Sequence, residues 1–244
     1  MRVEGKIVIV TGAAQGQGAA FAEALRTEGA TVIATDVNAG PGVDALDVSR
    51  QDAWNHVVAR TVDEHGRIDG LVNNAGITYR ARLGDVELEP FETLMRINVT
   101  GPLLGIQTVL PYMPDGGSIV NLGSVAAFQG HYPVAYTMSK WAIRGLTSVA
   151  AMELGGRRIR VNSIHPGYIE TPMTASAVPE FREASLRQSP IPRAGTTDDT
   201  APLVVFLIAD ESSYISGAEI SVDGGTAAHA GGKVISDALR QVGR

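Results

Sequence analysis

The stretch that decides the fold is Lys6 to Gly18, KIVIVTGAAQGQG. Its short β-branched run predicts a buried strand over residues 6–10, and the pattern of residues 16–28 predicts a helix that ends at Gly29. The glycines at 12, 16 and 18 lie where the strand turns into the helix. They would permit a tight turn and let a pyrophosphate approach the free N–H groups of the helix N-terminus. The stretch therefore predicts a dinucleotide-binding turn.

The same alternation of strand and helix continues along the chain. Strands are predicted over 31–35, 70–73, 118–122, 160–164 and 219–222, and helices over 51–65, 90–112, 134–154 and 200–209. Near-continuous apolar strands separated by helices indicate a parallel sheet covered on both faces. We expect one α/β domain over 1–244, a doubly wound Rossmann-type fold with about seven parallel strands. The proline-rich segment 169–197 is expected to be a long loop that carries function.

Composition narrows the possible partners. The chain has 244 residues, 44% of them hydrophobic, and a net charge of −6, which argues against nucleic acid and anionic membranes. Its densest basic stretch, residues 157–160, is interpreted as a solvated helix end. The absence of cysteine excludes disulfides, and the five histidines show no metal-ligand spacing, so we expect no metal. The apolar run 7–10 is too short for a signal peptide or a membrane span, which predicts a cytoplasmic protein.

Asp36 bears on the choice of coenzyme. It ends the second predicted strand, 18 residues beyond Gly18, where a carboxylate would accept hydrogen bonds from the adenosine ribose hydroxyls. A carboxylate there repels a 2′-phosphate, and no lysine or arginine lies between Ala13 and Gly18 or just after Asp36. The pattern favours NAD over NADP. The alternative is a loop aspartate chosen for turn chemistry.

Tyr136 and Lys140 lie four positions apart, on one face of a predicted helix. A free phenol has a pKa of about 10, and a nearby ammonium favours the phenolate. This spacing could form a proton-transfer pair, although it also arises often by chance.

The ordered motifs resemble those of the classical short-chain dehydrogenases/reductases over essentially the full chain. They are Thr11-Gly-x3-Gly-x-Gly18, Asn73-Asn-Ala-Gly76, Asn98, Ser124, Tyr136-x3-Lys140 and Pro166-Gly-x3-Thr171. The resemblance implies that Tyr136 exchanges a proton with an alcohol or ketone while hydride moves to or from a nicotinamide. Lys140 would lower the pKa of Tyr136 and bind the nicotinamide ribose, and Ser124 would stabilise the substrate oxygen. Asn98 would hold a water in a proton relay.

The resemblance also implies a set of coenzyme contacts. Asp47 would bond the adenine amino group beside Val48, and Ile169 and Thr171 would orient the nicotinamide carboxamide. The full set is Gly12, Gln15, Gly16, Gln17, Gly18, Asp36, Val37, Asp47, Val48, Asn74, Ala75, Gly76, Tyr136, Lys140, Pro166, Gly167, Ile169 and Thr171.

Asn98 and Ser124 have alternative interpretations, and the sequence departs from the family pattern at two places. Asn98 could be a helix-kink residue that bonds backbone, and Ser124 could be a turn residue. The family usually has an apolar residue where this chain has Gln17, and its Ser–Tyr gap is more often 13 than the 12 found here.

Within the family the chain resembles bacterial 3α/20β-hydroxysteroid dehydrogenases, through stretches such as residues 158–167 and 212–219. We expect a hydrophobic alcohol or ketone substrate, a steroid first, in a pocket built from residues 126–134 and 172–193. Its apolar candidates are Met173, Val178, Phe181 and Leu186, with Phe128, Gln129, His131 and Tyr132 bordering the substrate. Other cyclic or aryl substrates, a 3-oxoacyl-carrier-protein reductase and a non-catalytic dinucleotide sensor are the alternatives. The family habit predicts a homotetramer.

Overall fold

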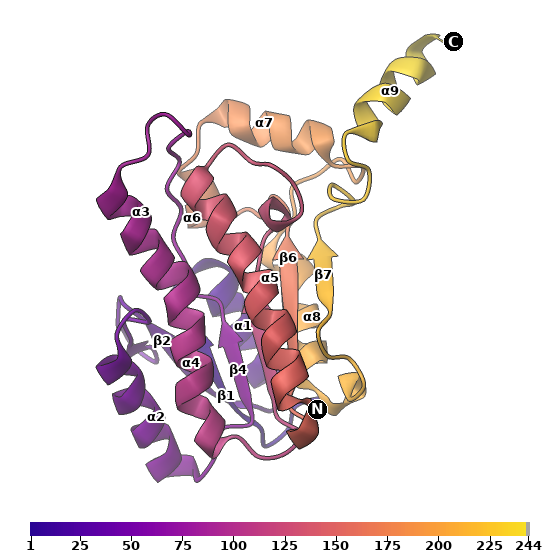
Figure 1. The fold of residues 1–244 in the computed structure, drawn as a ribbon. Coiled ribbons are helices and arrows are strands. Elements are labelled where there is room, and N and C mark those ends of the chain that lie inside the picture. Colours follow the sequence, from indigo (N-terminus) through magenta and orange to yellow (C-terminus); the bar gives the residue numbers. More distant parts are fainter. Residues whose placement is uncertain (243–244) are drawn as a thin grey trace.

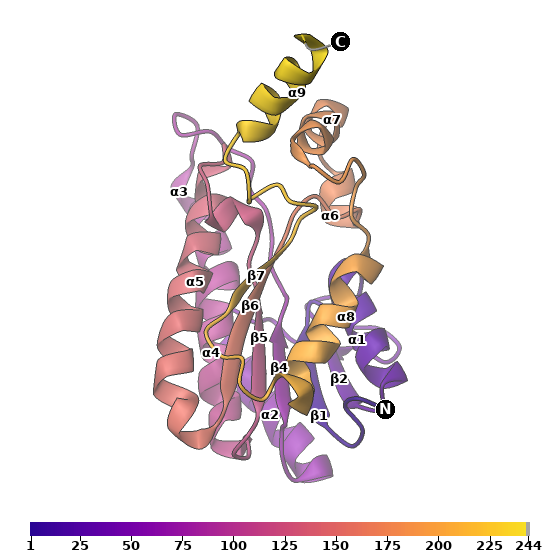
Figure 2. The ribbon, with the colours of Figure 1, turned by 90° about the vertical axis from the view of Figure 1, so that its right-hand side faces the viewer.

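The computed structural model describes residues 1–242, and its centre is a seven-stranded parallel sheet with the order β3-β2-β1-β4-β5-β6-β7. The strands are β1 (Ile7–Thr11), β2 (Thr31–Asp36), β3 (Asp44–Ala45), β4 (Gly70–Asn73), β5 (Ser118–Leu122), β6 (Arg160–Pro166) and β7 (Glu219–Val222). Figures 1 and 2 show helices on both faces of this sheet. The predicted doubly wound fold is confirmed. Strand order reverses between β1 and β4, and the carboxyl ends of the strands there form the crevice in which such folds bind ligands.

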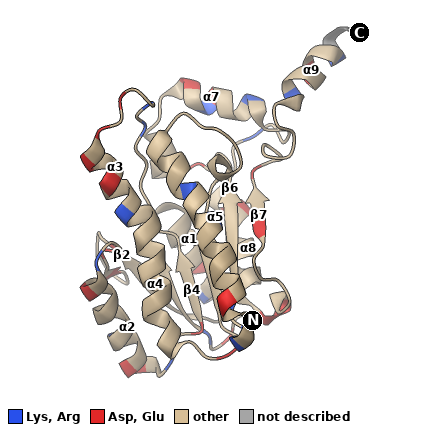
Figure 3. Cartoon of the chain, in the orientation of Figure 1, with Lys and Arg blue, Asp and Glu red and all other residues tan. Residues whose placement is uncertain are grey.

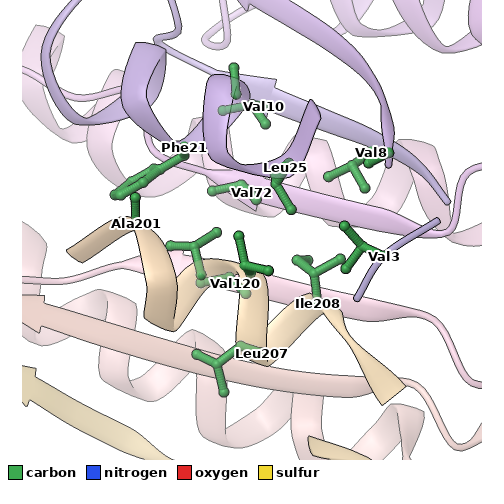
Figure 4. Packing of buried hydrophobic residues seen from close by; sticks show 14 of the residues in the cluster. Val3, Val8, Val10, Phe21, Leu25, Val72, Val120, Ala201, Leu207 and Ile208 are labelled. Carbon is green, nitrogen blue, oxygen red and sulfur yellow. The ribbon is translucent and has the colours of Figure 1, made fainter. Parts of the chain in front are cut away.

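Side chains that alternate along the strands contribute to two hydrophobic cores, one on each face of the sheet. Val8 and Val10 of β1 face one core, with α1 (Gly16–Thr27) and α8 (Thr197–Ile208), whereas Ile9 faces the other. Figure 4 shows Phe21 and Leu25 of α1 packed with residues of α8 over the strands. The opposite core lies under α2 (Gln51–His65), α4 (Gly101–Val109) and α5 (Val134–Leu154). Burial on both sides explains why the central strands β1, β4 and β5 are buried along their whole length.

The predicted helix over 90–112 has a more complex structure. It comprises α3 (Leu88–Met95), a π-helical turn (Arg96–Thr100), α4 and a 3-10 turn (Leu110–Tyr112). The π-turn contains Asn98, whose side chain bonds the Ile77 backbone outside the helix, and π-helical turns inside α-helices frequently occur at functional sites.

Three details differ from the sequence prediction. The segment 169–197 is not a loop throughout, because it contains α6 (Pro172–Ala175) and α7 (Pro179–Gln188). Both begin with proline, which suits the first position of a helix. Arg160 is not at a solvated helix end: it is buried in β6 and donates to the Leu207 carbonyl at 2.7 Å. A last helix, α9 (Gly232–Val242), extends away from the body of the fold (Figures 1 and 2).

Figure 3 shows the positions of charged residues scattered over several helices and loops and on β7. None of the helices within residues 1–242 is long and apolar enough to cross a membrane. In the same residues, no group of three or more His, Asp or Glu side chains is placed to hold a metal ion.

Candidate active site

The glycine turn after β1 is shaped by backbone that passes close to it. Gly12 has φ +67°, which favours glycine, and a Cβ there would lie 2.8 Å from the Ala75 Cα. A Cβ on Gly18 would lie 2.1 Å from the Gly12 carbonyl oxygen. Asn74 fixes the facing loop by donating to the carbonyls of Thr11 (2.8 Å) and Gly12 (3.1 Å). These contacts hold the N-terminus of α1 open toward a cleft.

That cleft has a volume of about 550 Å³ and lies along the carboxyl ends of β1, β2, β4 and β5. Fifteen of the eighteen predicted coenzyme residues line it: Gly12, Gln15, Gly16, Gln17, Gly18, Asp36, Val37, Asp47, Val48, Asn74, Ala75, Gly76, Tyr136, Lys140 and Thr171. Gly167 and Ile169 line a second cavity instead, and Pro166 lines neither of the two. The glycine cradle and the collected polar groups fit a dinucleotide.

Two carboxylates in the cleft already accept hydrogen bonds from the protein, whereas one side-chain amide oxygen does not. Asp36 accepts from the Ala14 and Asn38 N–H groups at 3.1 and 2.9 Å, and Asp47 accepts from the Ser49 hydroxyl at 2.7 Å. Gln17 differs, because its Oε1 is buried with no hydrogen-bond donor in the described chain. A buried carbonyl oxygen without a donor is costly, so this atom is available to a ligand that brings an N–H or O–H.

Helix α5 presents Tyr136 and Lys140 on one face, one turn apart. The Lys140 ammonium lies 5.6 Å from the centroid of the Tyr136 ring and donates to the Leu122 carbonyl at 2.8 Å. Burial lowers the pKa of Lys140 to about 8. Burial also raises the pKa of the Tyr136 phenol, while hydrogen bonding with Ser124 and the charge of Arg80 lower it. In the protein alone, desolvation therefore outweighs the groups that lower this pKa, and Lys140, from which we expected the lowering, is not among them.

Asn98 ties the π-turn to the loop after β4. Its Oδ1 accepts from the Ile77 N–H at 2.9 Å, and its Nδ2 donates to the Ile77 carbonyl at 3.0 Å and to Ser139 Oγ at 3.1 Å. These bonds use both Nδ2 hydrogens and leave one lone pair on Oδ1. The backbone-bonding alternative is thus present in the structure, and the proton relay stays a prediction.

Ser124 lies between the sheet and the start of a short 3-10 turn, and a buried histidine supports it. The Ser124 hydroxyl accepts from the Ala126 N–H at 3.2 Å. His165 Nδ1 lies 3.1 Å from the Ser124 carbonyl oxygen, and its Nε2 lies 2.8 Å from Ser163 Oγ. Burial lowers the pKa of His165, so the ring is neutral at pH 7.

The second cavity, of about 630 Å³, lies on the other side of Tyr136. Of the predicted pocket residues, Gln129, His131, Tyr132, Met173, Phe181 and Leu186 line it. Two expectations were wrong: Val178 is 64% exposed outside the lining, and Phe128 packs on the His165 ring with centroids 4.5 Å apart. Tyr136 and Met173 are the two described residues that line both cavities.

Comparison with known proteins decides the family. A family model described as Enoyl-(Acyl carrier protein) reductase matches residues 12–227. The chain belongs to the short-chain dehydrogenase/reductase family. A 3-oxoacyl-[acyl-carrier-protein] reductase of Thermotoga maritima is 42% identical, over 92% of this chain and 99% of its own. A 3-alpha-(or 20-beta)-hydroxysteroid dehydrogenase of Mycobacterium tuberculosis is 40% identical, over 93% and 91%.

Solved structures agree. A blue fluorescent protein from a metagenomic library, crystallised in complex with NADPH, has a TM-score of 0.87 and 33% identity, over 93% of this chain and 99% of its own. As a short-chain dehydrogenase/reductase, the protein is an oxidoreductase that acts on alcohol or ketone substrates.

Sequence reasoning missed some members of this short-chain dehydrogenase/reductase site. Leu122 and Gly123 line the dinucleotide cleft, and their position at the carboxyl end of a predicted strand could have indicated them. Arg80 in the second cavity and His165 behind Ser124 had no such signal, because their contacts join residues far apart in the chain.

Proposed function

We propose that the protein is an NAD-dependent oxidoreductase that interconverts a hydrophobic secondary alcohol and its ketone. The observation that carries the proposal is the position of Tyr136, which lines both cavities. Met173, the other shared residue, cannot exchange a proton at neutral pH. The acid–base group must contact coenzyme and substrate together and must also transfer a proton. Of the two shared residues, Tyr136 is therefore the one that can fill this role.

The other side chains have roles that follow from their places around the phenol. In alcohol oxidation, Tyr136 Oη takes the hydroxyl proton as hydride leaves the carbon, and in ketone reduction it returns that proton. Ser124 donates to the substrate oxygen while the oxygen carries developing charge. Lys140 holds its positive charge beside the phenol and reaches the dinucleotide cleft. Asn98 is proposed to hold a relay water through its free lone pair. A bound nicotinamide accepts or supplies the hydride and, when oxidised, adds a positive charge near the phenol.

NAD is favoured over NADP by Asp36, whose carboxylate lies in the cleft at the end of β2. The basic residues among the cleft lining are Lys140 and Arg96. Arg96 donates to Thr93 of the preceding helix α3. No basic side chain within the described lining is adjacent to Asp36 in sequence, so a 2′-phosphate there would face a carboxylate.

A steroid is the first substrate candidate. It is supported by the volume of the second cavity, by aromatic walls that include Tyr132 and Phe181, and by the name of the mycobacterial relative. Pockets of this size enclose most of the surface of a drug-sized ligand, which a steroid is. Other hydrophobic cyclic or aryl alcohols and ketones fit the same description. A homotetramer is proposed from the family habit, with the exposed Val149 and Met152 on α5 as contact candidates.

A 3-oxoacyl-carrier-protein reductase is the second candidate, favoured by the identity with the Thermotoga relative. It would use NADPH and a basic surface for its acidic carrier, and Asp36 and the net charge of −6 count against both. A dinucleotide sensor without turnover is disfavoured because Tyr136 and Lys140 are both present.

The test is NADH and NADPH oxidation, followed by absorbance, with ketosteroids, cyclic and aryl ketones and a 3-oxoacyl thioester. Tyr136→Phe should lower kcat by about 10²–10⁴-fold, the usual size of a general acid–base contribution, without weakening NADH binding. Tyr132→Phe is the matched control, since it removes a phenol oxygen from the same cavity. NADH binding without turnover of any substrate would indicate the sensor, and unchanged turnover in Tyr136→Phe would refute the mechanism.

A further inference from the structure

The cavity on the substrate side of Tyr136 contains one cation without an acidic partner. Four charged side chains line it: Arg80, Arg193, Asp199 and Asp223. Arg193 and Asp199 form a two-pronged pair with both N–O distances at 2.7 Å. The Asp223 carboxylate accepts from the N–H groups of Gly225 and Ala227 at 2.9 and 2.7 Å. Among residues 1–242, no carboxylate lies within ion-pair distance of Arg80.

The Arg80 guanidinium is fixed in place by neutral groups. Its Nη2 donates to the Met173 carbonyl at 2.9 Å, and its Nη1 donates to Ser176 Oγ at 3.2 Å. A guanidinium has five N–H groups in a planar fork, so three remain for another acceptor. A half-buried, immobilised fork of this kind loses little side-chain entropy when it binds a carboxylate with two parallel bonds.

The same cavity brings this charge near the reacting position. Arg80 and Tyr136 both line it, and the positive charge of Arg80 lowers the pKa of the Tyr136 phenol. Apolar and aromatic side chains line the same cavity, among them Met173 and Phe181. A single molecule in this cavity can therefore present its carbinol or ketone carbon to Tyr136 and a second, anionic group to Arg80.

We propose that Arg80 is a specificity-determining residue that selects substrates bearing a carboxylate in addition to the alcohol or ketone carbon. The inference rests on the proposed function and narrows its substrate class. The competing explanation is structural: Arg80 joins the loop after β4 to α6 and does nothing else.

Matched ketones separate the two explanations. We would compare para-acetylbenzoate with its neutral methyl ester, as substrates for reduction with NADH by the wild type, Arg80→Gln and Arg82→Gln. Arg82 is the control, because it is a nearby basic residue that is not part of the cavity lining. Its guanidinium carbon lies 5.2 Å from the centroid of the Tyr132 ring. Arg80→Gln should lower kcat/KM for the acid by about 10–100-fold, as expected for charge-assisted hydrogen bonds, and for the ester by less than about 3-fold.

The wild type should prefer the acid, and Arg82→Gln should retain that preference. Equal losses for acid and ester in Arg80→Gln would show a structural clamp and overturn the inference. A wild-type preference for the ester would overturn it as well.

Binding provides a readout that does not need turnover. Calorimetry with the NADH-loaded protein should show benzoate binding more tightly than benzamide in the wild type, with the difference lost in Arg80→Gln. Equal affinities in the wild type would overturn the inference even if the ketones are reduced. Selective benzoate binding without turnover of any ketone would instead count against the proposed function and leave the role of Arg80 supported.

Discussion

The Lys140 ammonium lies 5.6 Å from the centre of the Tyr136 ring, and the lysine is almost completely buried in the fold. Its single protein acceptor among the described residues is the Leu122 carbonyl. This burial lowers the pKa of Lys140 from 10.5 to about 8. Holding the pair in this position removes the lysine ammonium from water. This loss of hydration should have a measurable effect on the free energy of unfolding.

Stability should depend on pH through Lys140. Between pH 8 and 10.5 the unfolded chain binds the lysine proton and the folded chain does not, so folding becomes more favourable as pH rises through that window. The free energy of unfolding of Lys140→Met lacks this contribution. From pH 7 to pH 9.5 the wild type should gain about 1–2 kcal/mol relative to Lys140→Met, measured by urea unfolding. A constant difference across that range would contradict the assigned pKa.

Gly18→Ala should damage the dinucleotide cleft. The new methyl group would meet the Gly12 carbonyl oxygen at 2.1 Å and Asn74 Nδ2 at 2.4 Å, and neither can move without shifting the turn. We expect a loss of about 1–3 kcal/mol in the free energy of unfolding, together with loss of NADH binding. Gly145→Ala is the control, since the helical Gly145 has open space around its Cβ position. Normal NADH affinity in Gly18→Ala would show that the turn is not the coenzyme site.

His165 should make the fold acid-sensitive. Because its pKa is lowered in the folded state, the unfolded chain binds an extra proton below pH 6.5, and stability falls as pH falls from that value. Thermal unfolding at pH 7.5, 6.5 and 5.5 should show a smaller pH dependence in His165→Asn than in the wild type. His56→Asn changes an exposed histidine and should leave the wild-type dependence intact. If both variants respond to acid like the wild type, the sensitivity arises elsewhere.

Asp36→Ser tests the coenzyme preference. Removal of the carboxylate takes away acceptors for the ribose hydroxyls and the repulsion of a 2′-phosphate. We expect the ratio of kcat/KM for NADH over NADPH to fall by about 10-fold or more, a coupling of about 1.4 kcal/mol. Asn38→Ser, next to the same strand end and also lining the cleft, is the control. A wild-type preference for NADPH would overturn the proposal of NAD at once.

The sequence was most informative where one short stretch controls the structure. The run of residues 6–18 predicted β1, the glycine turn and α1 because each depends on neighbours in sequence. The two-residue strand β3 was missed, since Asp44 and Ala45 show no apolar alternation. α6 and α7 were missed because the prolines of residues 169–197 were interpreted as marks of a long loop, although proline also suits the first position of a helix.

Contacts between residues far apart in the chain could not be predicted from local sequence patterns. Arg80 reaches Met173, and His165 reaches Ser124, across 93 and 41 positions of the chain. The orphaned Oε1 of Gln17 is likewise a property of the packed cleft, although the residue itself was noticed as unusual. Family motifs predicted the site residues, whereas the contacts of Arg80, His165 and Gln17 required coordinates.

The junction of the two cavities at Tyr136 and Met173 has a kinetic consequence. Under the proposed function each ligand has its own compartment, so neither must depart before the other arrives, and no modified form of the enzyme has to persist between them. Initial rates measured at several fixed coenzyme concentrations should then give double-reciprocal lines that intersect, the pattern of a ternary complex, rather than parallel lines.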